Sequence, residues 1–379
     1  MRIAIVSLMG GLPWGGSEAL WYAVATHAID QGDEVFVSVY DWGSPNQKIK
    51  YLQQSGVKIN FRKRFNAEAT TFEKIVRFVK NRKPALNKDY QSIVDFKPDT
   101  VFISQGDSFD LAIHHKALHT LLRNNNIPYS FICHNHEQFG FIPSKEIYPG
   151  ALEIFKNAEH VFFVSNRQWQ LTERRLASKI TNGVITWNPL SIVVPDAALL
   201  WPDDETAQMA IVANIAGSKG HDTAFEVLSS PEWKQRKWIL NIYGNGEGIA
   251  YLKDLTFFYA IADKIKFHGH VADIVEVWQK NHLLLIPSAG EGLPISLVEA
   301  MACGRAAAVT DVGGNTELIT QNKTGFIAVS PTTEAFAAVM ENAWKEKENW
   351  EQLGKNAFDK INAVLEKKPG EKIYKLLKT

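Results

Sequence analysis

The sequence predicts an α/β protein built from two domains, each with a parallel sheet. The chain has 379 residues, about twice the usual size of one domain. Along its whole length, short apolar runs that end at Gly, Ser, Asn or Asp alternate with amphipathic segments of helical length. This alternation is typical of βα units. Hydrophobic residues make up 45% and charged residues 22% of the chain, which excludes disordered and fibrous classes.

Two series of apolar runs predict the strands. The helix after the first strand should begin near Ser17 and place Leu20, Ala23, Val24 and His27 on one face. The first series of strands is predicted at Ile3–Ser7, Glu34–Tyr40, Val57–Phe61, Thr100–Ser104, Tyr129–Cys133, His160–Ser165 and Ile185–Trp187. The second series is predicted at Ala210–Ile215, Trp238–Tyr243, Ile265–His268, His282–Pro287, Ala306–Thr310 and Gly325–Ala328.

These series suggest domain bounds. A first domain covers 1–190, and a second covers 206–349. The stretch 191–205 has little periodicity and is predicted to be the linker. A final helical segment at 350–379 is interrupted by Pro369-Gly370, and we expect it to cross back to the first domain.

Charge and cysteine content exclude several classes of protein. Lys+Arg and Asp+Glu both number 41, so attraction of the whole protein to nucleic acid is not expected. Cys133 and Cys303 lack metal-ligand spacing, which excludes a disulfide framework or zinc ribbon and favours the cytoplasm. The N-terminal apolar run is too short for a signal peptide. No stretch reaches the ~18 apolar residues of a spanning helix.

One region departs from the neutral average. Residues 48–88 contain 12 Lys or Arg and two acids, a local charge of +10. Apolar residues at helical spacing within it are typical of a basic amphipathic helix at an anionic surface. An ordinary solvated face is the alternative. We expect peripheral attachment to the inner face of a membrane, or binding of a lipid-linked or polyanionic acceptor. The candidate patch consists of Arg62, Lys63, Arg64, Lys74 and Arg77.

The segment Pro287–Gly304 carries the strongest chemical signal. It follows a buried strand, with Pro294 suited to the first turn of a helix and Gly304 to the position after its end. The free N–H groups at such a helix start make Gly292–Leu297 a phosphate site. Glu299 lies on this apolar helix and needs a partner. A sugar diol offers two donors, and an internal ion pair is the alternative.

This segment resembles a known signature. Glu291 and Glu299, separated by seven residues in E-G-L-P-I-S-L-V-E-A-M-A-C-G, resemble the Glu-x7-Glu motif of the retaining glycosyltransferases of family 4. Other similar segments follow in the expected order, strongly in the second half and weakly in the first: Gly10–Glu18, Ile211–Gly220, Leu240–Gly246, Phe267–Val271 and Thr310–Leu318.

The resemblance implies the GT-B fold, an α/β architecture in which two Rossmann-like domains with parallel sheets face a central cleft. The first domain would bind the acceptor and the second a nucleotide sugar. Glu299 would bind the ribose and Lys219 the diphosphate, and Glu291 would face the sugar as a catalytic residue. The other implied donor-binding residues are Gly15, Gly16, Asn214, His270, Val271, Gly292, Leu293, Pro294, Ser296 and Leu297.

The implied reaction is transfer of a hexose or N-acetylhexosamine with retention at the anomeric carbon. A UDP-sugar is the favoured donor and GDP-mannose the second. The acceptor would be a glycan, a lipid-linked or a small molecule. The chain contains no Asp-x-Asp triplet, so we predict a reaction without metal or other cofactor, in which donors and a Lys stabilise the leaving phosphate.

Two departures affect this assignment. Asn214 stands where the family usually has an Arg, so it brings no charge. The usual active-site His of the first domain is missing, and Gln105 is the candidate for its place. His134 and His136 follow at the end of the next strand and are further candidates for sugar or acceptor binding.

Other functions remain open at this point. Gly244–Gly248 follows a strand, as in a Rossmann dehydrogenase, but its spacing does not fit G-x-G-x-x-G. A nucleotide-sugar epimerase or a sugar phosphorylase would share the fold. A non-catalytic protein that binds sugar nucleotides would fit the two departures.

Overall fold

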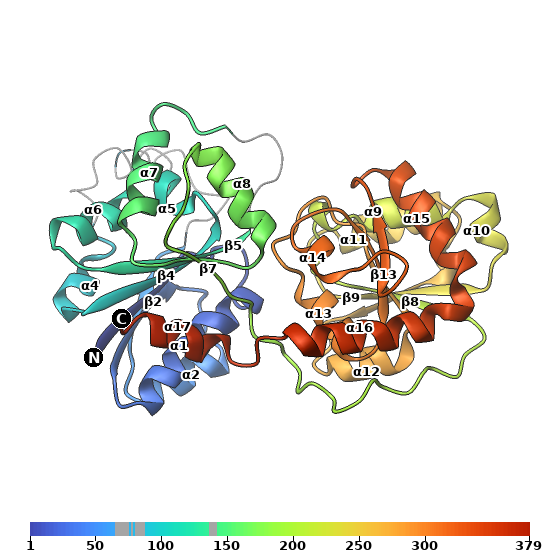
Figure 1. The fold of residues 1–379 in the computed structure, drawn as a ribbon, viewed down its shortest axis with the longest axis horizontal. Coiled ribbons are helices and arrows are strands. Elements are labelled where there is room, and N and C mark those ends of the chain that lie inside the picture. Colours follow the sequence, from blue (N-terminus) through green and yellow to red (C-terminus); the bar gives the residue numbers. More distant parts are fainter. Residues whose placement is uncertain (65–75, 77–78, 80–87, 136–141) are drawn as a thin grey trace. The chain divides into compact units, whose positions relative to one another are not determined.

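A computed structural model describes residues 1–64, 76, 79, 88–135 and 142–379. The chain forms two compact units (Figure 1). Unit 1 comprises Met1–Pro189 and Glu366–Thr379, and unit 2 comprises Leu190–Leu365. Each unit has a parallel sheet with helices on both faces, which confirms the predicted α/β class with two Rossmann-like units.

The sheet of unit 1 has seven strands in the order β3-β2-β1-β4-β5-β6-β7. Ile3 to Val6 in β1 are fully buried, as expected for a central strand covered on both faces. The strands are β1 (Arg2–Ser7), β2 (Glu34–Tyr40), β3 (Lys58–Arg62), β4 (Thr100–Asp107), β5 (Tyr129–Asn135), β6 (Val161–Phe163) and β7 (Gly183–Ile185). The helices are α1 (Gly16–Asp30), α2 (Gln47–Gln54), α4 (Gln91–Phe96), α5 (Asp110–Ile113), α6 (Lys116–Asn124), α7 (Tyr148–Asn157), α8 (Asn166–Leu176) and α17 (Pro369–Leu376).

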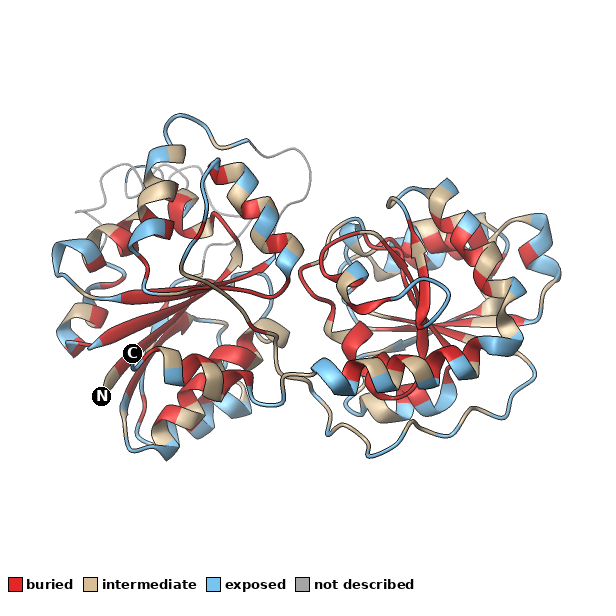
Figure 2. Ribbon diagram, in the orientation of Figure 1, coloured by how far each residue is buried: buried red, intermediate tan, exposed pale blue. Residues whose placement is uncertain are grey.

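The sheet of unit 2 has six strands in the order β10-β9-β8-β11-β12-β13. Its inner strands are buried between layers of helices, whereas the edge strand β10 is only partly covered (Figure 2). The strands are β8 (Ala207–Val212), β9 (Trp238–Tyr243), β10 (Ile265–Gly269), β11 (Leu283–Ile286), β12 (Ala306–Thr310) and β13 (Gly325–Ala328). The helices are η2 (Gly217–Lys219), α9 (His221–Leu228), α10 (Pro231–Gln235), α11 (Ile249–Phe258), η3 (Ala262–Lys264), α12 (Ile274–Lys280), α13 (Ile295–Ala302), α14 (Asn315–Leu318), α15 (Thr333–Lys345), η4 (Lys347–Asn349) and α16 (Trp350–Val364).

The strand order of both sheets reverses at their centre. In unit 1, β1 pairs with β2 and with β4; in unit 2, β8 pairs with β9 and with β11. Ligands of such sheets bind outside the carboxyl ends of the strands at this switch point. The loops that follow β1, β8 and β11 are therefore the places to look for binding sites.

Each predicted strand has a counterpart, and β2, β9, β12 and β13 have the predicted bounds. β8 begins and ends three residues earlier than predicted, because Ile215 is buried in a loop where its N–H bonds to Asn245 O. β7 begins and ends two residues earlier, because the carboxylate of Glu366 binds Thr186 and the N–H of Trp187 beyond the strand.

The C-terminal helix α17 packs on α1 within unit 1. Gly370 lies against Ala23, where an added Cβ would meet backbone at 2.7 Å. His27 packs edge-on against Tyr374, and the Tyr374 hydroxyl donates to Asp33. Ala23 and His27, which were predicted to share one face of α1, therefore contact α17. Leu20 and Val24 are fully buried. α16 packs against α13 and β12 in unit 2.

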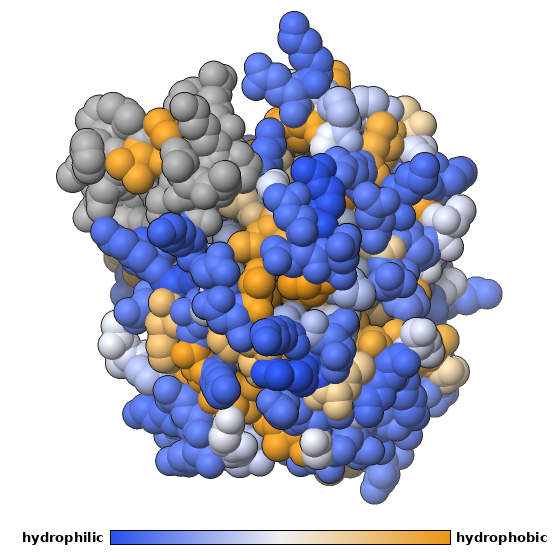
Figure 3. All heavy atoms as spheres, turned by 90° about the vertical axis from the view of Figure 1, so that its left-hand side faces the viewer, coloured by the Kyte–Doolittle hydropathy of each residue, from blue (hydrophilic) through white to orange (hydrophobic). Residues whose placement is uncertain are grey.

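The surface of unit 1 is mainly hydrophilic on the face shown in Figure 3, where apolar side chains appear in small groups. In the part of the chain that the structure describes, no helix is both long and apolar enough to cross a bilayer.

Candidate functional site

Three loops of unit 2 converge at the carboxyl ends of β8, β11 and β12. Ala289 N donates to Ser218 O at 2.8 Å, and Gly314 N donates to Gly292 O at 2.7 Å. Two glycines make this approach possible. Gly220 has a φ of +68°, and a Cβ there would lie 2.1 Å from Pro287 O. Gly313 has a φ of +50°, and its Cβ would lie 2.2 Å from Glu291 O. Any side chain would separate the loops.

Lys219 and Glu291 form an ion pair within this loop cluster. Lys219 Nζ donates to both carboxylate oxygens of Glu291, at 2.7 and 2.8 Å. Ser288 Oγ also donates to Glu291 Oε1 at 2.8 Å. Lys219 ends the short helix η2 after β8, whereas Glu291 lies in the loop after β11. The structure thus brings together two residues, 72 positions apart, that the sequence assigned to one donor site.

Glu299 is a buried carboxylate on the apolar helix α13. Only 4% of its surface is exposed. Ser191 donates to Glu299 Oε1 through its N–H at 3.2 Å and through its hydroxyl. Burial raises the pKa of Glu299, and the bonds from Ser191 oppose that rise. Both hydrogen bonds from Ser191 end on Oε1. Among the described residues no donor binds Oε2, so this oxygen can accept a hydrogen bond from a ligand. Sequence reasoning missed Ser191, because it lies in the predicted linker without a motif.

The start of α13 lies beside these carboxylates. Pro294 precedes the helix, and its carbonyl accepts from Leu297 N at 3.1 Å and Val298 N at 3.4 Å. No side chain of the described residues caps this start. Ser296 and Ile295, in the first turn, are half-buried, whereas Gly292, Leu293 and Pro294 are buried. The remaining N–H groups and the helix dipole suit an anion.

The other predicted donor residues of unit 2 lie at the same edge of the sheet. Asn214 is exposed in the loop after β8, and His270 is exposed after β10, followed by half-buried Val271. Gly244 N donates to Gly269 O at 2.7 Å, which joins the loop after β9 to the last residue of β10. The donor-binding residues predicted in unit 2 therefore lie together at the carboxyl ends of its strands.

Unit 1 places Gly15 and Gly16 at the start of α1, after β1. Gly15 is the extended residue before the helix. Glu18 in the first turn is buried, accepts a hydrogen bond from Ser17 Oγ at 2.8 Å, and lies 3.5 Å from the Cβ position of Gly15. Burial raises the pKa of Glu18 to about 7. Glu18 belongs to the Gly10–Glu18 motif, but its burial was not predicted.

The predicted catalytic residues of unit 1 are used within the fold. Gln105 is fully buried; its Nε2 donates to Ser108 O, and its Oε1 accepts from Leu111 N, both at 3.0 Å. That amide is not available for substrate, which corrects the expectation of a catalytic Gln105. His134 is 8% exposed, and its Nε2 lies 3.0 Å from Ser104 Oγ. Burial lowers the pKa of His134 to about 3, so the imidazole is neutral. His136 lies outside the described residues.

Arg62 does not belong to a surface patch. It is 5% exposed; its guanidinium donates to Tyr90 Oη and Ser7 O and lies 4.5 Å from the ring centroid of Tyr40. Its role is to join β3 to β1 and its neighbours, which corrects the patch prediction. Lys63 is exposed, and Arg64 stacks on Trp42 at 4.2 Å. Lys74 and Arg77 lie outside the described residues.

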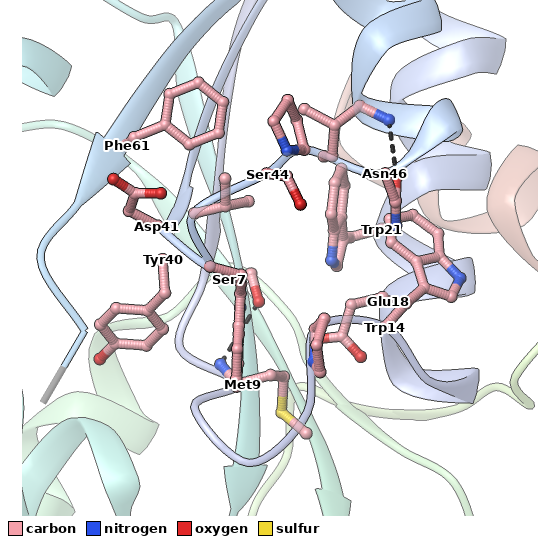
Figure 4. A pocket seen from close by; sticks show the side chains of 15 residues that line it. Ser7, Met9, Trp14, Glu18, Trp21, Tyr40, Asp41, Ser44, Asn46 and Phe61 are labelled. Carbon is pink, nitrogen blue, oxygen red and sulfur yellow. Dashed lines mark hydrogen bonds between the residues drawn. The ribbon is translucent and has the colours of Figure 1, made fainter. Parts of the chain in front are cut away.

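Unit 1 also has a hollow at the carboxyl ends of β1, β2 and β3 (Figure 4). It is lined by aromatic side chains together with Glu18, and the sequence analysis did not predict it. As for metals, no cluster of three or more His, Cys, Asp or Glu with suitable geometry occurs among the residues that the structure describes. The metal-independent reaction stays a prediction.

Comparisons with known proteins agree with the geometry of unit 2. Residues 200–360 match the family described as glycosyl transferases group 1. An uncharacterized glycosyltransferase of Haemophilus influenzae is 24% identical over 258 residues, covering 67% of this chain and 72% of the relative. The N,N'-diacetylbacillosaminyl-diphospho-undecaprenol alpha-1,3-N-acetylgalactosaminyltransferase of Campylobacter jejuni is 24% identical over 204 residues, 54% of each chain.

The alignments with two solved structures cover the whole of this chain and 98% of each solved chain. Anabaena Alr3699/HepE in complex with UDP-glucose has a TM-score of 0.72 at 15% identity. Sucrose-phosphate synthase from Thermosynechococcus elongatus has a TM-score of 0.74 at 16% identity. These likenesses show the GT-B fold. The match to glycosyl transferases group 1 covers residues 200–360, which lie in unit 2.

Proposed function

We propose that this chain is a glycosyltransferase of the group 1, GT-B type, and that it transfers a hexose or N-acetylhexosamine from a nucleotide sugar to an acceptor hydroxyl with retention. The proposal includes membership of family 4. UDP-sugars are favoured as donors, with GDP-mannose second; the structural neighbour Alr3699/HepE was solved with UDP-glucose. The acceptor would be a glycan, a lipid-linked or a small molecule. The Campylobacter jejuni relative, whose name contains diphospho-undecaprenol, supports the lipid-linked class.

The observation that carries this proposal is the Glu299 carboxylate, in which Ser191 binds one oxygen and the other oxygen can accept from a ligand. Its Oε1 is bound by Ser191, and its Oε2 lies on the same helix whose start suits a phosphate. A ribose diol supplies hydroxyl donors, and a diphosphate supplies the anion. A nucleoside diphosphate is one ligand that meets both requirements. The proposal therefore assigns the ribose to Glu299 and the distal phosphate to Ser296 and Leu297.

The two residues of the Lys219–Glu291 ion pair bind different parts of the donor: Lys219 the diphosphate and Glu291 the sugar. An arriving diphosphate competes with Glu291 for Lys219, because both are anions within reach of one ammonium group. Glu291 then accepts hydrogen bonds from hydroxyls of the donor sugar. Asn214, at the adjacent strand end, can donate to a phosphate but adds no charge.

The transfer step follows from this placement. The bond between the anomeric carbon and the phosphate oxygen breaks, and the bond to the acceptor oxygen forms on the same face of the sugar. The acceptor proton passes to the leaving phosphate. Lys219 and the N–H groups at the start of α13 stabilise the charge that develops on that phosphate. The step needs no covalent intermediate with the enzyme, and we propose that it needs no metal.

The test is a titration of the full chain with UDP, GDP, ADP, CMP and NAD, followed by thermal unfolding and calorimetry. A ligand at about 100 times its Kd stabilises the native state by ~2.7 kcal/mol. One nucleoside diphosphate, with or without EDTA, should raise the Tm of the wild type. Glu299→Gln should abolish the shift, whereas Glu334→Gln, at an exposed position of α15, should retain it.

The alternatives give different outcomes. Stabilisation by NAD alone would favour a dehydrogenase. Turnover of a UDP-sugar without acceptor, or with phosphate as acceptor, would favour an epimerase or a phosphorylase. Binding without turnover across a panel of acceptors would favour a non-catalytic binding protein. NMR of the product's anomeric proton separates retention from inversion.

A further inference from the structure

The hollow of unit 1, here called the aromatic hollow, has a chemistry that the donor site does not use. It encloses a cavity of about 50 Å³ at the carboxyl ends of β1, β2 and β3. Its walls are aromatic, and its polar groups come from β1, from α1 and from the loop after β2 (Figure 4). The lining residues are Ser7, Met9, Pro13, Trp14, Glu18, Trp21, Val39, Tyr40, Asp41, Trp42, Ser44, Pro45, Asn46, Ile49 and Phe61.

Two buried polar groups of α1 meet at this hollow. Trp21 is 1% exposed, and its Nε1 has no hydrogen-bond partner among the described residues. An unpaired buried donor is destabilising, so such groups are rare unless a ligand or water accepts from them. Glu18 is 6% exposed and lines the same space, as Figure 4 shows. The pair offers one donor and one carboxyl group.

A hydroxyl group matches this pair, because it accepts one hydrogen bond and donates another. Burial raises the pKa of Glu18 to about 7, so near neutral pH the carboxyl group can either accept or donate. The cavity volume exceeds the ~10–15 Å³ that one water needs. It is too small for a whole sugar ring, so a ring edge with its hydroxyl would enter.

The aromatic walls and the charges specify the ligand further. Trp14, Tyr40 and Trp42 are half-buried, so they offer apolar surface to the C–H face of a sugar. The charged lining residues are Glu18 and Asp41. Lys48 lies over the ring of Trp14 at 5.1 Å and Arg64 over that of Trp42 at 4.2 Å, and neither lines the cavity. An anionic group inside the hollow would meet like charge.

We propose that the aromatic hollow is a binding subsite for an uncharged sugar unit, one hydroxyl of which accepts from Trp21 Nε1 and bonds to the Glu18 carboxyl group. Assignment of that sugar to the acceptor rests on the proposed function. The subsite itself lies wholly within unit 1 and is independent of the nucleotide.

The experiment measures sugar binding without nucleotide. Saturation-transfer NMR on the full chain uses methyl α-D-glucopyranoside and N-acetylglucosamine as neutral probes, with glucose 6-phosphate as the anionic one. At least one neutral sugar should receive saturation and the phosphate should not. Trp21→Phe keeps the ring but removes the donor, and it should weaken binding about three- to tenfold, the effect of one hydrogen bond.

Controls separate this result from misfolding and from failure of the proposed function. Trp169→Phe makes the same change at a residue that stacks on Phe163 outside the hollow, and it should bind like the wild type. Glu18→Ala should also weaken binding. UDP titration of each sample reports on the site at Glu299. Loss of UDP binding alone would refute the donor site and leave the subsite standing.

Three results would overturn the inference. The first is no saturation of any neutral sugar by the wild type, which would assign the hollow to water. The second is equal weakening by Trp21→Phe and Trp169→Phe, which would place the effect on folding. The third is preference for glucose 6-phosphate, which would make this an anion site.

Discussion

Replacing the buried carboxyl group of Glu18 should change how the stability of unit 1 depends on pH. Burial raises the pKa of Glu18 from 4.5 to about 7. Between these values the folded chain retains a proton that the unfolded chain has lost, so the free energy of unfolding falls as the pH rises. The free-energy cost of ionising the buried Glu18 carboxyl group is absent below pH 4.5 and complete above pH 7. The shift of about 2.5 units corresponds to roughly 3 kcal/mol.

Glu18→Gln removes this titration while keeping a neutral group of similar shape that can accept from Ser17. The variant should match the wild type near pH 4.5 and exceed it by about 2–3 kcal/mol at pH 8. Urea unfolding of both proteins at several pH values between 4.5 and 8 measures the difference. Buried His134 and His221, whose pKa values lie near 3 and 4, act equally in both proteins and cancel. A difference that is constant with pH, or that falls as pH rises, would refute the argument.

The remaining predictions concern other buried polar groups. Ser191→Ala removes the hydroxyl hydrogen bond to Glu299, keeps the bond from the backbone N–H, and should raise the pKa of Glu299 further; nucleotide affinity should then fall about three- to tenfold at pH 6 and less at pH 8, by calorimetry, and equal loss at both pH values would contradict this. Arg305→Lys should destabilise unit 2 by about 3 kcal/mol or more in urea unfolding, because the guanidinium donates to six backbone carbonyls including Leu200 O; a loss under 1 kcal/mol would contradict it. Arg62→Ser should lower the Tm of the protein without changing its sedimentation with anionic vesicles, whereas unchanged Tm with lost sedimentation would restore the patch.

The candidate donor site could be proposed from the sequence because its motif is continuous. The helix α13, with its preceding loop and both glutamates, lies within one short segment whose Pro, Gly and apolar pattern determine the turn and the helix. Lys219 was assigned because the segment Ile211–Gly220 resembles a segment of the family. Ser191 was not predictable, because its bond to Glu299 joins residues 108 positions apart. Such pairings depend on tertiary packing rather than local pattern.

The errors in unit 1 have a common cause. A charge count says nothing about which side chains point inward. In β3 the alternation of the strand exposes Phe61 and buries Arg62, so a residue counted as surface charge became part of the core. Gln105 lies near the end of the central strand β4, where Ser108 O and Leu111 N bind its amide. The strands were found from apolar runs, but the depth of their last residues was not encoded in those runs.

The attachments near the two chain crossings have a mechanical consequence. Thr186 and Trp187 are bound to Glu366 in unit 1, and Ser191 is bound to Glu299 in unit 2. Only Asn188, Pro189 and Leu190 separate these attachments, and proline fixes one of the torsions. The return crossing is as short, since Leu365 N bonds back to Ile361 O and Glu366 follows. Any rotation of one unit against the other would therefore involve only a few backbone torsions. At its unit 2 end, the first crossing is bound to the carboxylate proposed to hold the nucleotide.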